Sequence, residues 1–323
     1  MRGRYRVSVQ NKKIIYEFEL VRNITVIRGD SASGKTTLID MLSQYEQNGD
    51  SSGISLKCEK RCVVLTAVRW KENLDNIHDS IVFIDDNSRF ITSDDFARAV
   101  KMSDCYFVII TRDNLYNLPY SVDEIYGIRE SGKYAGLKKC YNEFYRIYSG
   151  ATKADRLPEC VLTEDSNSGY EFFEALSRDK GIECISAGGR SQVAAVLSAM
   201  SGRACLVIAD GAAFGCEMNR ITELLNAGSA IVLYLPESFE WLILKSGLVD
   251  GRRIEELLEH PEDHVESSEY FSWERFFSSV LISETEGTYL KYSKEKLNDA
   301  YLQEREKNAI IEAMDRIGDL FRK

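Results

Sequence analysis

The stretch NITVIRGDSASGKTTLIDMLSQY, residues 23–45, decides the fold of the first half of the chain. Its apolar run ITVI predicts a short strand, and the helical spacing of Leu38 and Leu42 predicts a helix that follows. Between the two lies GDSASGKT, residues 29–36, which matches the pattern G-x-x-x-x-G-K-[ST]. In this strand-to-helix context the pattern predicts a loop that binds the phosphates of a nucleotide.

The residues of this loop have distinct expected roles. Gly29 and Gly34 let the backbone turn tightly and direct its N–H groups at phosphate oxygens, and the N-terminus of the helix adds partial positive charge. Lys35 is expected to reach the β- and γ-phosphates, and the hydroxyl of Thr36 to hold Mg²⁺. ATP and Mg²⁺ are the expected cofactors, and GTP stays open as the alternative nucleotide. The residues expected to contact the nucleotide are Gly29, Asp30, Ser31, Ala32, Ser33, Gly34, Lys35, Thr36 and Thr37.

Two further strands are expected to end in polar residues beside this loop. SIVFIDDN, residues 80–87, predicts a strand with Asp85 and Asp86 at its carboxyl end, where ligands of parallel sheets bind. Asp85 is placed to hold Mg²⁺ through water, and Asp86 to activate the attacking water as a general base. Because an aspartate is shorter than the more usual glutamate, slow hydrolysis or nucleotide sensing alone stays open. The strand CYFVIIT, residues 105–111, ends in Thr111, whose hydroxyl is expected to bond the γ-phosphate or the water.

Short apolar strands alternate with helical stretches in two parts of the chain. That alternation predicts an α/β fold with a mostly parallel sheet in each part. The first part, residues 1–150, opens with the strand pair YRVSV and KIIYEFEL, and the second alternation occupies residues 151–249. Residues 250–323 are acidic and predict a helical C-terminal extension. An apolar stripe in it predicts one helix that packs on the second domain or at a subunit interface: Ile310, Met314, Ile317 and Phe321.

Acidic residues close two strands of the second part. Glu164 follows the strand CVLT and Asp210 follows CLVIA, so the two carboxylates are expected at the same edge of the sheet. Carboxylates that meet there suggest a Mg²⁺ site. Between them, Gly188 and Gly189 form an expected strand-to-helix turn, with Arg190 available for a phosphate.

The first part resembles the P-loop ATPases of the ABC and AAA-like group over about residues 4–125. The resemblance rests on GDSASGKT, IVFIDD and VIITRD, and the opening strand pair is similar to the β-subdomain of ABC-type ATPases. It implies ATP binding and hydrolysis, with catalytic roles for Lys35, Asp86 and Thr111 and Mg²⁺ bound by Thr36 and Asp85. The chain departs from the ABC pattern because no LSGGQ-like signature and no Q-loop are readable. A small-molecule kinase carries the same loop and is the main alternative, although no arginine-rich lid is readable either.

The second part resembles the Toprim domain of topoisomerases, primases and OLD-family nucleases over about residues 158–245. The shared order is a glutamate after the first strand, a glycine turn after the second and an aspartate after the third. OLD-family nucleases also join an ABC-like ATPase to a C-terminal Toprim domain. By position, Glu164 would be the catalytic general acid/base or a metal ligand, and Asp210 a Mg²⁺ ligand. Ala212 stands where the family has a second aspartate, so a degenerate domain used for binding or regulation stays open beside a nuclease.

The charge and hydropathy of the chain restrict the class of protein. Its 323 residues carry a formal net charge of −10, which argues against a protein that coats nucleic acid by bulk charge. Residues 1–28 are the basic end of the chain and the candidate local surface for nucleic acid. No apolar run approaches the ~18 residues of a membrane-spanning helix, so no membrane span and a cytoplasmic location are expected.

The leading hypothesis is a Mg²⁺-dependent, ATP-hydrolysing protein whose nucleotide state controls a Toprim-like domain that acts on nucleic acid. One alternative is a nucleotide-gated protein-interaction module without nuclease activity, and another is a small-molecule phosphotransferase. The expected partners are a nucleotide, DNA, a protein partner and further copies of the chain in a homo-oligomer.

Overall fold

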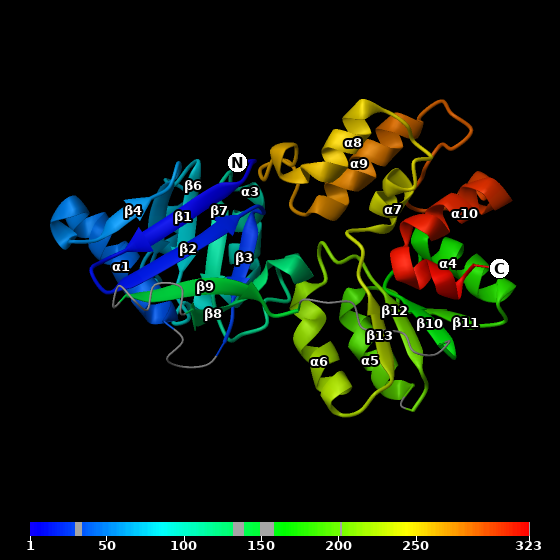
Figure 1. Cartoon of the computed structure of the whole chain (residues 1–323), viewed down its shortest axis with the longest axis horizontal. Helices are drawn as coiled ribbons and strands as arrows, with labels where there is room; N and C mark the ends of the chain where they lie inside the picture. Colours follow the sequence, from blue (N-terminus) through cyan, green and yellow to red (C-terminus); the bar gives the residue numbers. More distant parts are fainter. Residues whose placement is uncertain (30–33, 132–138, 149–157, 201, 323) are drawn as a thin grey trace. The chain divides into compact units, whose positions relative to one another are not determined.

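The chain divides into two compact units. The computed structural model describes residues 1–29, 34–131, 139–148, 158–200 and 202–322. One unit comprises Met1–Ser149 with Glu262–Phe271, and the other comprises Gly150–Pro261 with Ser272–Lys323. Both combine helices with a β-sheet, which confirms the expected α/β class (Figure 1). No helix among the described residues combines the length and the apolar character needed to cross a bilayer.

The first unit is built on one large mixed sheet. Its strands are β1 (Tyr5–Gln10), β2 (Ile14–Leu20), β3 (Ile24–Ile27), β4 (Ser55–Lys57), β5 (Arg61–Leu65), β6 (Ser80–Ile84), β7 (Tyr106–Ile110), β8 (Ile125–Ser131) and β9 (Cys140–Arg146). Among the described residues they form a nine-stranded sheet in the order β4-β1-β2-β9-β8-β3-β7-β6-β5. The five strands from β8 to β5 run parallel, whereas β1 pairs antiparallel with β2 and β4. The predicted parallel core and opening antiparallel pair are therefore both present.

The centre of this sheet is buried on both faces. Every residue of β3, β6 and β7 is buried, and their apolar runs ITVI, SIVFI and YFVII are typical of parallel strands covered on both sides. Helix α1 (Lys35–Asn48) buries Leu38 and Leu42 in the same core as Phe83 and Val108. Each such side chain contributes about 1.5–3 kcal/mol when it leaves water, so this packing fixes the two ends of the loop between β3 and α1. The unit also contains α2 (Trp70–Leu74) and α3 (Asp94–Met102).

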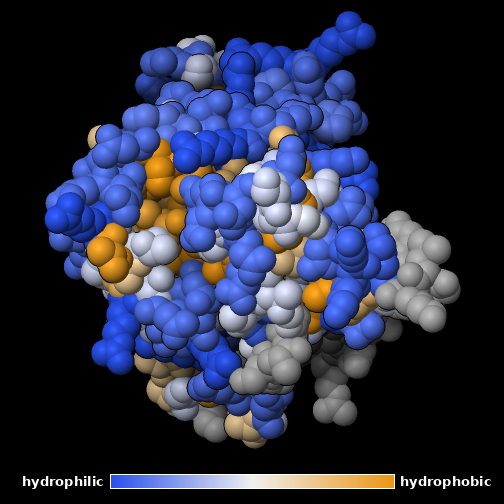
Figure 2. Space-filling view, turned by 90° about the vertical axis from the view of Figure 1, so that its left-hand side faces the viewer, coloured by the Kyte–Doolittle hydropathy of each residue, from blue (hydrophilic) through white to orange (hydrophobic). Residues whose placement is uncertain are grey.

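The surface contrasts with this core. The face in Figure 2 is mostly hydrophilic, with hydrophobic residues visible in smaller areas between polar ones. All eight cysteines are free thiols, and the buried ones, which pack like small hydrophobic residues, are Cys105, Cys160, Cys205 and Cys216.

The second unit has a smaller sheet. Its strands are β10 (Cys160–Thr163), β11 (Glu183–Ser186), β12 (Cys205–Ile208) and β13 (Ile231–Tyr234). In the described part of the unit they run parallel in the order β11-β10-β12-β13. Its α-helices are α4 (Ser168–Asp179), α5 (Val193–Ala199), α6 (Met218–Asn226), α7 (Phe239–Lys245), α8 (Arg252–Glu259), α9 (Trp273–Thr285) and α10 (Glu304–Ala313). Because β11 and β12 flank β10, the strand order reverses there, and ligands of such sheets bind beyond the carboxyl ends at that point.

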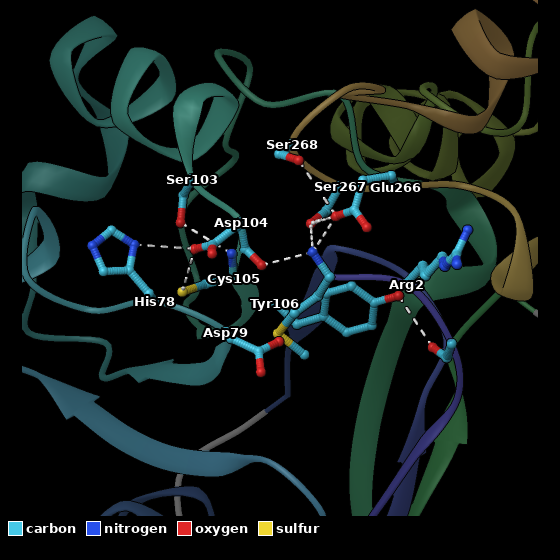
Figure 3. Close-up of polar contacts among 12 residues, drawn as sticks. Arg2, His78, Asp79, Ser103, Asp104, Cys105, Tyr106, Glu266, Ser267 and Ser268 are labelled. Carbon is cyan, nitrogen blue, oxygen red and sulfur yellow. Dashed lines mark hydrogen bonds and ion pairs between the residues drawn. The ribbon is translucent and has the colours of Figure 1, made fainter.

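The segment Glu262–Phe271 belongs to the first unit and packs around the N-terminus of the chain. The α-amine of Met1 donates to the carbonyl of Asp104 (2.8 Å) and to Ser267 Oγ (2.7 Å), and it forms an ion pair with Glu266 (Figure 3). The N–H of Ser267 donates to the carbonyl of Met1 (2.9 Å). The region beyond residue 250, predicted as one extension, is thus shared between the two units.

The apolar stripe of the C-terminus does not lie on one helix. Helix α10 ends at Ala313, and the backbone reverses at Asp315, which has a φ of 53°. A short 3₁₀ helix, Asp315–Leu320, follows. The continuous helix predicted from the spacing is therefore wrong, although Ile310, Met314, Ile317 and Phe321 are all buried within the second unit.

Candidate functional site

Glycines with positive φ values stand at both described ends of the loop between β3 and α1. Gly29 has a φ of 129° and Gly34 a φ of 86°, a conformation that glycine adopts without strain. Lys35 is the first residue of α1, only 7% exposed, and its Nζ donates to the carbonyl of Gly29 (2.7 Å). Its ammonium therefore reaches back from α1 to Gly29, and Thr36 is exposed. The predicted contacts Asp30, Ser31, Ala32 and Ser33 lie outside the described residues.

Tyr16 supports this loop from the opening strand pair. Its side chain on β2 is fully buried, and its hydroxyl donates to the carbonyl of Gly34 (2.7 Å). A Cβ at Gly34 would lie 2.8 Å from that hydroxyl, so the contact adds to the requirement for glycine there. Burial raises the pKa of Tyr16 to about 12, which keeps its hydroxyl a donor. The sequence did not reveal this role, since Tyr16 has only the inward position of an ordinary core residue in β2.

Tyr16→Phe is expected to weaken nucleotide binding about three- to tenfold, because the carbonyl of Gly34 loses its donor and the loop loses a fixed end. A fluorescent ATP analogue would give the dissociation constant, with melting temperature measured in parallel. Tyr5→Phe is the matched control, since Tyr5 also donates its hydroxyl to a carbonyl of the first unit, that of Arg2 (2.5 Å). Equal nucleotide affinity in Tyr16→Phe and Tyr5→Phe would contradict the role of Tyr16.

Polar residues at the ends of β6 and β7 meet beside β3. The N–H of Thr111 donates to the carbonyl of Ile27 (3.1 Å), which joins the end of β7 to the last residue of β3. The carboxylate of Asp86 accepts the N–H of Arg112 (3.1 Å), and the Arg112 guanidinium lies 3.4 Å from it. The buried hydroxyl of Thr111 accepts the N–H of Asp113 (2.9 Å). The structure thus brings Asp86 and Thr111 to the carboxyl ends of adjacent strands, with Asp86 oriented by Arg112.

Asp85 follows β6 immediately and is only partly exposed. Its Oδ2 accepts a hydrogen bond from the amide of Asn87 (3.1 Å). The ion pair between Arg112 and Asp86 is largely solvent-exposed on the Arg112 side, and such pairs contribute only ~0–1 kcal/mol. Mg²⁺ or water can therefore contact either carboxylate without displacing a strong interaction.

Glu164 and Asp210 lie together at the switch point of the second sheet. Glu164 follows β10 and Asp210 comes two residues after β12, and these strands are adjacent and parallel. The N–H of Asp210 donates to Glu164 Oε2 (3.1 Å). Burial raises the pKa of Glu164 to about 7 and holds the pKa of Asp210 well above its usual range. The predicted meeting of the two carboxyl groups at one edge is thus found.

These two residues line a small cavity with groups the sequence did not bring together. The cavity measures about 30 Å³, room for about one or two waters and far too little for a nucleotide. Asp165, Glu240 and Tyr292 also line it, together with Lys294 from the C-terminal region. Lys294 pairs with Glu274 of α9 and lies 4.0 Å from Glu240. Burial would lower the pKa of Lys294, but Glu240 and Glu274 outweigh burial and raise it.

The neighbouring glycine turn and the position of Ala212 complete this edge. Gly188 and Gly189 have φ values of 74° and 135°, and the N–H of Gly189 donates to the carbonyl of Glu164 (2.7 Å). Arg190 donates to the carbonyl of Ala213 (3.0 Å). Ala212, where the Toprim resemblance predicts a second aspartate, is buried.

Glu164→Gln is expected to stabilise the fold at high pH. Because the folded-state pKa of Glu164, about 7, lies above the usual 4.5, this carboxyl stabilises the fold below about pH 4.5, and that contribution is lost as the pH rises to about 7. Glutamine removes the charge and keeps an acceptor for the N–H of Asp210. We expect the variant to be about 1–3 kcal/mol more stable than wild type at pH 8, and the two to converge near pH 4.5. Melting temperatures from pH 5 to 8 test this, with Glu159→Gln on an exposed residue as control; equal shifts in both variants would contradict it.

Part of the positive charge at the basic end of the chain is paired or buried, whereas Arg2, Lys12 and Lys13 are exposed. Arg4 pairs with Glu262 and Glu19, and Arg6 with Glu17. Arg22 and Arg28 are buried. Residues 1–28 therefore present less positive charge than their composition suggests.

The chain was compared with protein-family models and with curated proteins. No protein-family model matches the chain, and no curated protein matches it significantly. Among the described residues, no group of three or more His, Cys, Asp or Glu side chains is arranged to hold a metal ion. The Mg²⁺ ligands predicted from the sequence, Thr36 with Asp85 and Glu164 with Asp210, thus remain predictions.

Proposed function

We propose that the first unit binds and hydrolyses ATP with Mg²⁺, as the resemblance to ABC and AAA-like ATPases implies. The observation that carries this proposal is the order β3-β7-β6. It brings the glycine loop with Lys35, the Thr111 hydroxyl and the Asp85–Asp86 pair to the carboxyl ends of three adjacent parallel strands. Ligands of such sheets bind at that edge.

The described residues at this edge fit a triphosphate and its metal. Lys35 would bind the β- and γ-phosphates after releasing the carbonyl of Gly29, and the exposed hydroxyl of Thr36 would join Asp85 as a Mg²⁺ ligand. Mg²⁺ would neutralise charge on the phosphates. Asp86 would orient and deprotonate the attacking water, and Thr111 would hydrogen-bond the γ-phosphate or that water.

The second unit is proposed to be a Toprim-like domain that acts on nucleic acid under control of the nucleotide state. The strand order β11-β10-β12-β13 and the approach of Asp210 to Glu164 support this assignment. Glu164 and Asp210 would bind Mg²⁺ and assist cleavage of a phosphodiester bond. Buried carboxyls with raised pKa values are typical of functional sites.

A nucleotide-gated interaction module without nuclease activity is the second candidate. The buried Ala212 and the presence of Lys294 among the carboxylates favour it, since both reduce the number of ligands available to Mg²⁺.

One experiment tests both candidates. It measures ATP hydrolysis by the purified protein with Mg²⁺, with and without single- and double-stranded DNA, and follows the DNA of the same reactions on a gel. Hydrolysis stimulated by DNA supports the nucleic-acid function. Hydrolysis indifferent to DNA that stays intact and unbound supports the interaction module, and no hydrolysis or ATP binding at all would contradict both.

A further inference from the structure

Lys294 places a positive charge inside the acidic pocket of the second unit. Its ammonium pairs with Glu274 and lies 4.0 Å from Glu240, and the side chain lines the same cavity as Glu164 and Asp210. Lysine and glutamate are seldom buried unless paired. Glu240 is 2% exposed, so the ammonium of Lys294 supplies a counter-charge that this carboxylate cannot obtain from water.

The backbone that carries Lys294 is held in place by buried hydrogen bonds. The N–H of Ser168, at the start of α4, donates to the carbonyl of Lys294 (3.1 Å), and the hydroxyls of Ser168 and Tyr292 lie 2.7 Å apart. The hydroxyl of Tyr292 also donates to Glu240 Oε1 (2.8 Å). Farther along, the N–H of Leu297 donates to the carboxylate of Glu171 (2.6 Å). These contacts hold the segment 292–297 over the pocket and thereby fix the position of Lys294.

Lys294 and Glu274 also line a second, open depression along α9, beside Ser278 and Ile282. The ammonium therefore lies between the enclosed pocket and the surface. A divalent cation that entered from this side would meet Lys294 before it reached Asp210. The cavity of about 30 Å³ that remains beside the side chain of Lys294 has room for only one or two waters, so a bound cation would lie close to the ammonium.

We propose that Lys294 is a built-in cation that occupies the acidic pocket in place of a divalent metal, so that the site accepts Mg²⁺ only after the segment 292–297 moves away. This inference rests on the proposed function of Glu164 and Asp210 as metal ligands. It explains how four carboxylates, those of Glu164, Asp165, Asp210 and Glu240, line one pocket although no metal-binding group of three is formed in the described residues. A fifth carboxylate, that of Glu274, pairs with Lys294 from outside the lining. It also gives the second unit a closed state that a partner or a change in the first unit can open.

Mn²⁺ binding, followed by the electron paramagnetic resonance signal of the free ion and without nucleotide, tests the proposal. Lys294→Met keeps the length of the side chain and removes its charge. We expect it to bind one Mn²⁺ about tenfold or more tightly than wild type, because the repulsion between the ammonium and the cation is gone. The gain should disappear in Lys294→Met/Asp210→Asn. Lys291→Met, on an exposed lysine just before this segment, should bind like wild type.

Further variants keep the proposal testable if Lys294→Met does not fold. Tyr292→Phe removes the hydroxyl that holds the segment to Glu240 and Ser168, and it should give a smaller gain in Mn²⁺ affinity. Lys294→Arg keeps the charge and should give none.

Two outcomes overturn the proposal in different ways. Tight Mn²⁺ binding by wild type that Asp210→Asn removes would mean that the pocket is a metal site but that Lys294 does not block it. No Mn²⁺ binding by folded Lys294→Met would remove the metal site itself, and with it the proposed cleavage function.

Discussion

Lys35→Ala is expected to weaken ATP binding about 100-fold or more and to stop hydrolysis, because it would remove two charge-assisted hydrogen bonds of ~1.5–3 kcal/mol each to the phosphates. The structure supports this size of effect. The ammonium lies 2.7 Å from the carbonyl of Gly29, and Lys35 is buried. Lysine therefore does not have to be ordered when the nucleotide binds.

Equilibrium titration with a fluorescent ATP analogue measures this loss. Lys35→Met is the companion variant, since it keeps the buried stem and separates the loss of charge from the loss of packing. Lys101→Ala, on an exposed lysine of α3, is the control. Unchanged ATP affinity in folded Lys35→Met would show that this loop is not the nucleotide site.

Glu164→Gln and Asp210→Asn are each expected to reduce Mg²⁺-dependent nicking of plasmid DNA by about 100-fold or more, since each would remove a proposed ligand of the catalytic metal. Either change leaves the hydrogen bond between the Asp210 N–H and residue 164 possible, so the fold should persist. Nicking rates over a Mg²⁺ titration give the measurement. Glu223→Gln, on an exposed residue of α6, is the control. Nicking that survives both substitutions would place the active site elsewhere, and its absence in wild type would favour the interaction module.

Elements with strong local signals could be predicted from the sequence. The run ITVI, the glycine pattern and the spacing of Leu38 and Leu42 together predict β3, the loop and the start of α1 at Lys35, because each signal is contained in neighbouring residues. Acidic residues directly after apolar strands predict the edge where Glu164 and Asp210 meet, because parallel strands share their carboxyl ends.

Contacts between distant parts of the chain could not be predicted. Lys294 and Glu240 are 54 residues apart in the sequence, and Met1 and Ser267 are 266 residues apart. No periodic pattern in the sequence predicts either contact. The hydrogen bond from Tyr16 to Gly34 is similar, since the tyrosine alternates like any core residue of β2. The break after α10 was missed because helical spacing continues past Met314 while the backbone at Asp315 takes a positive φ.

In the proposed function, a nucleotide bound in the first unit controls what the second unit does to nucleic acid. The most direct test measures DNA binding and nicking in the same reactions by wild type and Lys35→Met, without nucleotide, with ATP and with a non-hydrolysable ATP analogue. We expect the DNA binding or nicking of wild type to change with the nucleotide added, whereas Lys35→Met should behave alike in all three conditions. Identical action of wild type on DNA whichever nucleotide is present would contradict it.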